Sequence, residues 1–326
     1  MDILCVGMYR ACSTWQYEVA AHLLEQSHGG QRLGYVCGDE YARLPANNRS
    51  GTGWRILKCH EGHPAFRSAL HSGNALALYA IRDPRDVVYS MMHKRQQSFE
   101  TFLTQGMIHQ ILANDQEWTE RVSGARLDQR YEQIIAEPAT SVLEIAQFIG
   151  KAISRRQAGH IASEYSFEAN QRRTRQTADS LRAAGLDLAD PSNAIVQDDN
   201  TLLHWNHMRQ GKVGDWCARA NLSERYVMAC LLNGWLQNHG YAPEPADLAS
   251  STLSTSEQMR LQAKMAWGSV RCQLRCMALY HPGTGRVVKR ALGLQPRDVA
   301  RPASAIVGPH QSKAVAERTN STISSI

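Results

Sequence analysis

The feature that most constrains the fold is a regular alternation of short apolar runs with longer stretches of helical periodicity. The apolar runs have the length of strands and cover residues 3–7, 33–37, 55–59, 75–82 and 125–131. Helical stretches separate or follow them at 14–25, 86–93, 99–122 and 140–149. Strand–helix alternation indicates a parallel sheet with helices on both faces. We therefore predict a three-layer α/β fold whose ligands bind beyond the carboxyl ends of the strands.

The chain divides into two parts by composition. Residues 166–205 read as polar and irregular, and a helix is expected at about 223–238 with Ser223 as its N-cap. After Pro243 and Pro245 the composition changes, so we place a boundary near residue 250. We predict a catalytic domain at 1–250 and a basic extension at 251–326, with an amphipathic helix at about 256–279 followed by a flexible segment.

The positive charge is concentrated in that extension. Residues 256–326 hold 11 Lys or Arg against 3 Asp or Glu, whereas the preceding 255 residues hold 25 against 27. The body is therefore close to neutral, and we expect no nucleic-acid partner. For the helix at 256–279 we rank three roles: packing on the body is the first, binding at a membrane surface the second, and binding a partner protein the third. We expect the extension to be dispensable for chemistry.

Cysteine usage and hydropathy bear on location. The eight cysteines are scattered without metal-ligand spacing, so we expect no metal. The first residues read as a strand rather than a signal peptide. No apolar run approaches the roughly 18 residues that a membrane span needs. We expect a cytoplasmic protein with reduced thiols and no transmembrane segment; its oligomeric state is left open.

The first candidate site segment is the loop 7–15, between a strand and a helix. Such a loop presents backbone N–H groups and the positive end of the helix dipole to an anion. Ser13 and Thr14 add hydroxyl donors, and Arg10 adds a guanidinium. The Gly-Lys-[Ser/Thr] of a Walker A loop is absent, which disfavours ATP hydrolysis. The alternative is an ordinary capped turn.

The second segment places Lys58 and His60 at the end of a strand. Because they are two residues apart, both side chains leave the strand on one face. A cation that can stabilise developing negative charge is thus paired with a base that titrates near neutrality. The alternative is a structural or exposed histidine.

Two further segments carry cations suited to a phosphate. Arg82 ends a strand and Ser90 lies on the next helix, so that both could meet one phosphate, unless this is only a charged turn. Residues 207–216 hold two glycines and the cations Arg209 and Lys212. Glycines allow the backbone to approach a phosphate closely. Asp215 and Trp216 are expected to anchor this segment to the body.

Taken together, these segments resemble the cytosolic type of the PAPS-dependent sulfotransferases, where PAPS is 3′-phosphoadenosine-5′-phosphosulfate. The loop around Arg10-Ala11-Cys12-Ser13-Thr14-Trp15 resembles the family's 5′-phosphosulfate loop, and Arg82 and Ser90 its 3′-phosphate motif. The run Arg209-Gln210-Gly211-Lys212-Val213-Gly214-Asp215-Trp216 is similar to its RKGxxGDW signature. Lys58-Cys59-His60 looks like its catalytic Lys-x-His, and Tyr131-Glu132 like its nucleotide-contacting tyrosine region. The resemblance spans residues 3 to 240 in the correct order.

The resemblance implies roles for these residues. His60 is the expected base, and Arg10 and Lys58 neutralise charge on the leaving nucleotide. Trp15 stacks on adenine and Tyr131 reaches the nucleotide. The residues that hold the donor are Arg10, Ala11, Cys12, Ser13, Thr14, Trp15, Arg82, Ser90, Tyr131, Arg209, Gln210 and Gly211. Two departures, Ala11-Cys12 for Ser-Gly and Gln210 for Lys, bear on donor affinity.

The reaction expected from the resemblance moves a sulfuryl group from PAPS to a hydroxyl or amine of a small, polar acceptor, such as a natural product of secondary metabolism. The product nucleotide is 3′,5′-adenosine bisphosphate (PAP), and no metal is required. The acceptor is expected to touch residues 38–53, 92–122 and 165–205. Two alternatives stay open: a P-loop nucleotide kinase, and a catalytically silent nucleotide-binding scaffold protein. A histidine of ordinary pKa would make the rate fall below roughly pH 6.

Overall fold

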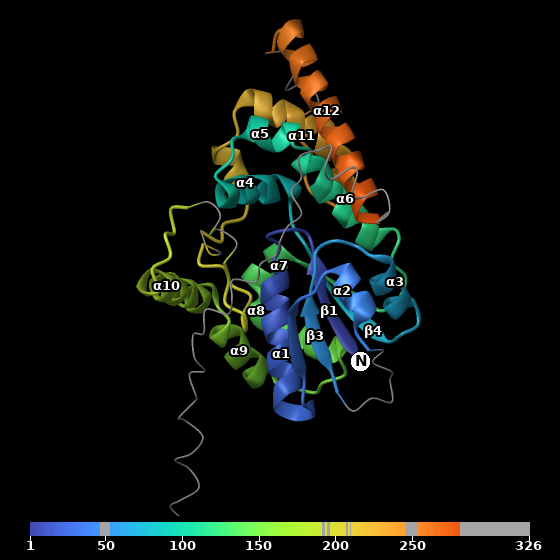
Figure 1. Cartoon of the computed structure of the whole chain (residues 1–326), viewed down its shortest axis with the longest axis vertical. Helices are drawn as coiled ribbons and strands as arrows, with labels where there is room; N and C mark the ends of the chain where they lie inside the picture. The colour runs from blue at the N-terminus through green and yellow to red at the C-terminus, as the bar shows by residue number, and fades with distance from the viewer. Residues whose placement is uncertain are drawn as a thin grey trace, which may run out of the picture.

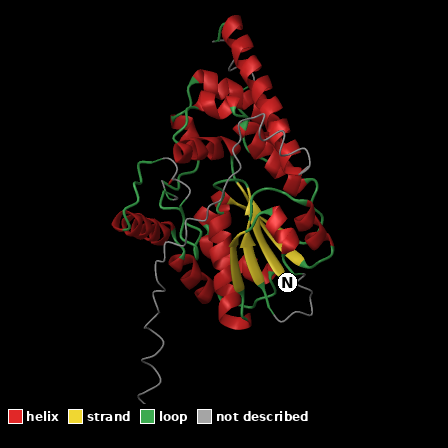
Figure 2. Cartoon of the chain, in the orientation of Figure 1, coloured by secondary structure: helices red, strands yellow, loops and turns green. Residues whose placement is uncertain are grey.

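A parallel five-stranded sheet forms the centre of the computed structural model, which describes residues 1–45, 53–190, 193, 196–206, 208, 210–245 and 253–280. The strands run in the order β2-β3-β1-β4-β5 and all pair in parallel. Their bounds are β1 Asp2–Gly7, β2 Gln31–Tyr35, β3 Arg55–Lys58, β4 Ala75–Ile81 and β5 Arg126–Arg130. The predicted α/β class is confirmed, and each of the five expected strands is present within two residues of its predicted ends (Figure 2).

Helices cover both faces of the sheet (Figure 1). Along the buried strand β1, alternate side chains point to opposite faces. Ile3 and Cys5 pack with α1, α8 and α9 in one apolar cluster, whereas Leu4 and Val6 pack with α3, α4, α6 and α11 in another. The helices of the first half are α1 Ser13–His28, α2 Gly38–Arg43, α3 Pro64–His71, α4 Pro84–Arg95, α5 Phe99–Thr104, α6 Met107–Thr119, α7 Tyr131–Ala136 and α8 Pro138–Phe148. Those that follow are α9 Arg155–Glu164, α10 Phe167–Ala183, the 3₁₀ helix η2 Asp215–Ala218, α11 Leu222–Asn238 and α12 Thr255–Tyr280.

Three helical predictions need correction. Residues 99–122 form two helices, because Gly106 adopts φ 72° between α5 and α6. Residues 166–205 are not irregular throughout, since α10 occupies their first part. The N-cap of α11 is Asn221, which exchanges hydrogen bonds with Glu224, and Ser223 instead donates to Glu257.

The predicted C-terminal amphipathic helix is present as α12, and it packs on the body. It lies along α5, α6 and α11 at the edge of the helical group (Figure 1). Gly268 meets this group so closely that a Cβ there would lie 2.4 Å from the carbonyl oxygen of Leu103. The boundary near residue 250 remains a prediction. The flexible segment expected after residue 279 falls almost entirely outside the described residues.

Candidate active site

The sheet order determines which loops can meet. Because β3 and β4 flank β1, the carboxyl ends of these three strands lie side by side. They deliver Lys58 from β3, the loop after Gly7 from β1, and Arg82 just after β4. Ligands of open parallel sheets bind at such a position. The candidate residues from separate segments are therefore brought to one edge of the sheet.

The loop between β1 and α1 is held in an unusual backbone conformation. Gly7 has φ 130°, and a Cβ on it would lie 2.3 Å from the carbonyl oxygen of Ala80, so only glycine fits this approach to β4. Arg10 and Cys12 also have positive φ, 62° and 77°. Cys12 is the N-cap of α1 and makes no side-chain cap hydrogen bond, and the first turn of α1 carries no acidic residue. The buried Ser13 and Thr14 open that turn.

Arg82 joins three of the four segments. Its guanidinium donates to the carbonyl oxygens of Arg10 and Lys212, each at 3.0 Å. The same guanidinium stacks 3.9 Å from the ring centroid of Tyr131. Arg10 in turn donates through Nε to Ser90 Oγ at 3.0 Å. Arg10, Arg82, Ser90 and Tyr131 therefore form one contiguous group.

Asp86, which sequence reasoning missed, ties the fourth segment to α4. Its carboxylate accepts hydrogen bonds from the backbone N–H groups of Gly214 at 2.8 Å and Trp216 at 3.2 Å. It also lies 3.3 Å from Arg82 Nη2. Trp216 is buried under the guanidinium of Arg85, as expected of an anchor, whereas Asp215 pairs with Arg219 at 3.7 Å.

His60 is oriented by the loop that follows β1. Its Nδ1 lies 3.1 Å from the carbonyl oxygen of Gly7. A carbonyl can only accept, so Nδ1 must carry the proton, and Nε2 keeps its lone pair. The centroid of the imidazole lies 4.7 Å from that of the Tyr9 ring. The backbone carbonyl of His60 accepts a hydrogen bond from Trp118 Nε1. The structure therefore selects the tautomer that leaves Nε2 basic.

Two neighbouring titratable groups are committed elsewhere. Glu61 accepts from the hydroxyls of Tyr35 at 2.6 Å and Tyr9 at 3.2 Å. His63 caps α3 by accepting from the backbone N–H of Ala65 at 3.2 Å. The lone pair of His63 is therefore occupied, on Nδ1. The lone pair of His60, on Nε2, is not used by these contacts.

The site is electropositive and poorly solvated. Burial and the nearby Arg10 lower the pKa of Lys58 to about 8. Burial, Arg10 and Lys58 lower the pKa of Lys94 to about 6. Burial, followed by the charge of Lys58, lowers the pKa of His60 to about 3. Like charges gathered in a dry site favour binding of an anion. Lys94, on α4, is a further site residue that sequence reasoning missed.

The remaining candidates differ in burial and in the part of the fold that they contact. Trp15 is 8% exposed and packs in the apolar cluster with α8 and α9. Ala11 is buried, Gln210 is exposed, and Gly211 lies against the ring of Phe167 with φ 65°. Arg209 lies outside the described residues.

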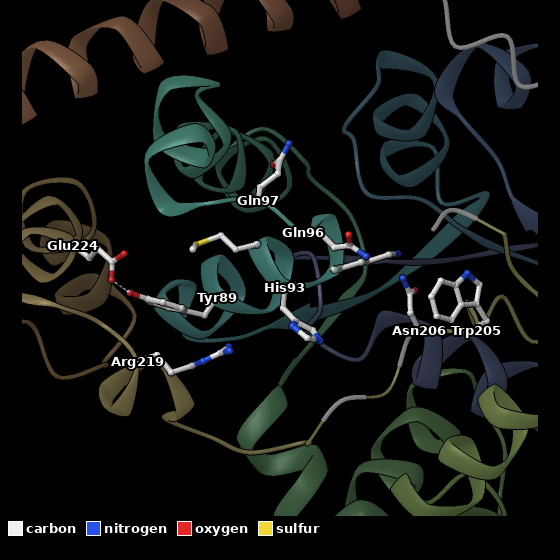
Figure 3. A pocket seen from close by; sticks show the side chains of 10 residues that line it. Tyr89, His93, Gln96, Gln97, Trp205, Asn206, Arg219 and Glu224 are labelled. Atoms are coloured by element: carbon white, nitrogen blue, oxygen red, sulfur yellow. Dashed lines mark hydrogen bonds between the residues drawn. The ribbon is translucent and has the colours of Figure 1, made fainter. Parts of the chain in front are cut away.

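A pocket of about 480 Å³ opens beside the second half of α4. Figure 3 shows Tyr89 and His93 of α4 on one wall, with Trp205 and Asn206 from the segment before the fourth motif opposite. Lys94 also lines it. The pocket mixes aromatic surface with charged and amide groups. Within the described ranges, no group of His, Cys, Asp or Glu could hold a metal ion, and no helix is long and apolar enough to cross a membrane.

Residues 2–229 match the family model described as the sulfotransferase domain. The chain belongs to the sulfotransferase family. This assignment confirms the resemblance, and it separates the protein from the P-loop kinases that were the alternative enzyme class. No curated protein sequence matches this sulfotransferase significantly.

Solved structures agree on the fold. The mouse sulfotransferase SULT7A1 complexed with PAP has a TM-score of 0.50 and 16% identity, covering 73% of this chain and 85% of that one. Retinol dehydratase in complex with androsterone and inactive cofactor PAP has a TM-score of 0.50 and 17% identity, covering 76% and 83%. At this identity the likeness supports the α/β architecture of the sulfotransferase.

Proposed function

We propose that this sulfotransferase moves a sulfuryl group from PAPS to a hydroxyl or amine of a small, polar acceptor, with His60 as the base. The observation that carries the proposal is the contact of His60 Nδ1 with the Gly7 carbonyl, 3.1 Å long. With the proton held on Nδ1, Nε2 keeps the lone pair that a base needs, and the imidazole lies close enough to Lys58 to feel its charge.

Transfer follows as an in-line displacement. The acceptor oxygen or nitrogen attacks sulfur, its proton passes to His60 Nε2, and the bond from sulfur to the bridging phosphate oxygen breaks. The electron pair of that bond stays on the phosphate oxygen, so PAP leaves with the additional negative charge. Arg10 and Lys58 neutralise this charge, as fixed cations do in phosphoryl transfer. The scheme routes no step through a metal.

The donor is proposed to bind along the contiguous group of Arg10, Arg82, Ser90 and Tyr131. The loop amides of Ala11 and Cys12, with the hydroxyls of Ser13 and Thr14, would hold the 5′ side at the start of α1. Trp15 and Tyr131 would contact the nucleotide base and sugar side. The residues proposed for the 3′-phosphate are Arg82, Ser90, Arg209, Gln210 and Gly211.

Two details of the structure support this 3′-phosphate site. Ser90 Oγ accepts from Arg10, so its own O–H remains a donor for a phosphate oxygen. The buried Nε of Arg82 has no hydrogen-bond partner among the described residues. Buried donors are normally satisfied, and a bound phosphate oxygen would satisfy this one.

The pocket beside α4 is the proposed acceptor site. Its residues fall partly in the ranges 92–122 and 165–205, where the acceptor was expected to bind. Arg219 from the pocket wall suits an acceptor with polar or anionic substituents, Lys94 offers a largely neutral amine near pH 7, and Trp205 offers a flat surface. All eight cysteines are free thiols, which fits a proposed location in the cytoplasm.

The experiment that tests the proposal combines a donor and an acceptor search. The protein is incubated with PAPS and a metabolite extract, and mass spectrometry follows products heavier by one SO₃ group together with release of PAP. We expect both signals, and neither with ATP in place of PAPS. Tight PAP binding by calorimetry without any SO₃-bearing product would instead support the silent nucleotide-binding alternative.

A further inference from the structure

Helix α12 carries two apolar faces, and only one of them is used by the fold. The inner face repeats at helical spacing through Leu261, Met265, Gly268 and Cys272, all of which are buried. It contacts α5 and α6: Met265 O lies 3.1 Å from His109 Nε2, and Arg275 donates to Gln105 O at 2.9 Å. This face explains why α12 packs on the body.

The outer face is an exposed apolar stripe. Residues at positions 259, 263, 267, 270, 274 and 277 are three or four apart, which places them on one side of a helix. Exposed fractions are 59% for Met259, 55% for Trp267, 44% for Val270 and 52% for Met277. These four account for four of the seven large apolar residues that are exposed in the described part of the chain. Such a concentration on one helix marks an interaction surface.

The charge around the stripe has a single sign. Residues 258–280, the described part of α12 after its first turn, contain four Lys or Arg and no Asp or Glu. Within α12, Arg260 and Arg271 border the stripe on one side, because each directly follows a stripe residue, Met259 or Val270. Lys264 on the same side already pairs with Glu100 of α5 at 2.5 Å. The surface is therefore apolar with a basic border.

We propose that the outer face of α12 docks on the anionic headgroup surface of a lipid bilayer. Amphipathic helices with aromatic and aliphatic residues on one face and Lys or Arg beside them lie in the plane of such interfaces. Tryptophan is favoured at the headgroup level, where Trp267 would sit at the middle of the stripe. The contact is peripheral, because the inner face stays packed on α5 and α6. The inference is independent of the proposed catalytic function.

A second copy of the chain fits this surface less well. Pairing two outer faces along α12 would bring the basic borders of both copies together, with no carboxylate between residues 258 and 280 to compensate them. Like charges in contact oppose association. An anionic bilayer instead attracts each of these cations by about 1 kcal/mol near its surface.

The test is co-sedimentation of the full-length protein with vesicles of phosphatidylcholine alone or mixed with phosphatidylserine. We expect binding to the mixed vesicles that weakens with added salt, and much weaker binding to phosphatidylcholine alone. Trp267→Glu should lower partitioning by at least about tenfold, and Arg260→Ala and Arg271→Ala by roughly fivefold each. Ile135→Glu, at an exposed position of α7, is the matched control and should bind as the unchanged protein does.

Three outcomes would overturn the proposal. Equal binding to both kinds of vesicle would remove the charge argument. Unchanged binding by Trp267→Glu would place the contact outside α12. A dimer that forms without vesicles and disappears in Trp267→Glu, with no vesicle binding, would assign the face to a second copy. Transfer in solution should be unaffected by Trp267→Glu, because this exposed residue takes no part in the proposed chemistry.

Discussion

Lys58 connects the electrostatics of the site to a measurable pH dependence. Its pKa is lowered to about 8, first by burial and then by Arg10, so it is charged below that pH and neutral above it. If its charge stabilises the leaving nucleotide, kcat/KM for PAPS should fall as the pH rises through about 8, since kcat/KM reports the free enzyme. Lys58→Arg should move this limb to higher pH, because a guanidinium stays charged.

The acid side of the profile should differ from that of an ordinary histidine. The sequence led us to expect a loss of rate below roughly pH 6. Burial and Lys58 lower the pKa of His60 to about 3, so the base remains neutral well below pH 6. If the fall of kcat/KM near pH 8 is unchanged in Lys58→Arg, the assignment of Lys58 is contradicted. If kcat/KM falls on the acid side near pH 6.5, and this fall is absent in His60→Gln, the buried setting of His60 is contradicted.

Cys12 stands in a backbone conformation that favours glycine. Its φ of 77° lies in the left-handed region, where a Cβ costs about 1–2 kcal/mol. Burial raises the pKa of its thiol to about 12, so the side chain remains protonated and adds no charge to the loop. Cys12→Gly should therefore raise the free energy of unfolding by about 1 kcal/mol in a denaturant titration.

The matched control for this prediction is Cys37→Gly. Cys37 is also an N-cap, but its φ is −78°, which any residue adopts. Here the greater freedom of glycine in the unfolded chain should lower stability by about 0.5–1 kcal/mol. A gain of similar size at both positions would show that removing a thiol, and not relief of strain, stabilises the protein.

At the scale of elements, the contact between α5 and α12 depends on Gly268. An added Cβ would meet Leu103 O at 2.4 Å and Gly106 Cα at 3.4 Å. Gly268→Ala should push α12 away from α5 and cost about 1–3 kcal/mol of stability, as overpacking does. The measurement is the midpoint of unfolding in urea, which should fall while the dependence of the free energy of unfolding on urea concentration stays the same.

Gly234 provides the control, because it also lies inside a helix, α11, but a Cβ there meets nothing within 4 Å. Gly234→Ala should stabilise the protein by about 0.5–1 kcal/mol through helix propensity. Stabilisation by both variants would mean that α12 does not pack closely on α5.

The sequence predicted strands better than helices for identifiable reasons. Buried strands such as β4 are continuous apolar runs, which few other structures produce. Helix α10 was missed because its buried stripe consists of small or polar residues such as Asn170, Thr174 and Ala178. Their spacing of four was visible, but hydrophobicity did not mark them. Gly106 was the available signal for the break between α5 and α6.

At the scale of the whole molecule, the location of the site followed from the sequence, but its internal geometry did not. Parallel strands place the segments after β1, β3 and β4 at one edge, so that Arg10, Lys58 and Arg82 could be expected together. The contact of His60 with Gly7 and the tie from Asp86 to Gly214 join residues 53 and 128 positions apart. No local pattern encodes such pairs. The pKa of Lys94 is lowered first by burial and then by Arg10 and Lys58 from other segments, with a smaller effect of the adjacent Arg95.

The packing of α12 also changes how its dispensability should be tested. Removing all residues after 250 would uncover the partners of Leu261 and Met265, which are buried in the full chain. We still propose that the extension takes no part in the chemistry. A chain that ends at residue 280 keeps this packing and should transfer sulfate at the rate of the full chain.

The most direct test of the account is steady-state sulfuryl transfer by His60→Ala, with PAP binding measured on the same preparation. We predict that turnover falls by about 10²- to 10⁴-fold, the usual contribution of a general base. PAP affinity should stay within a factor of about two, because no donor contact is assigned to the imidazole. His63→Ala is the control, since His63 caps α3, and it should retain most of its turnover. Retained turnover in His60→Ala together with its loss in His63→Ala would contradict the central claim.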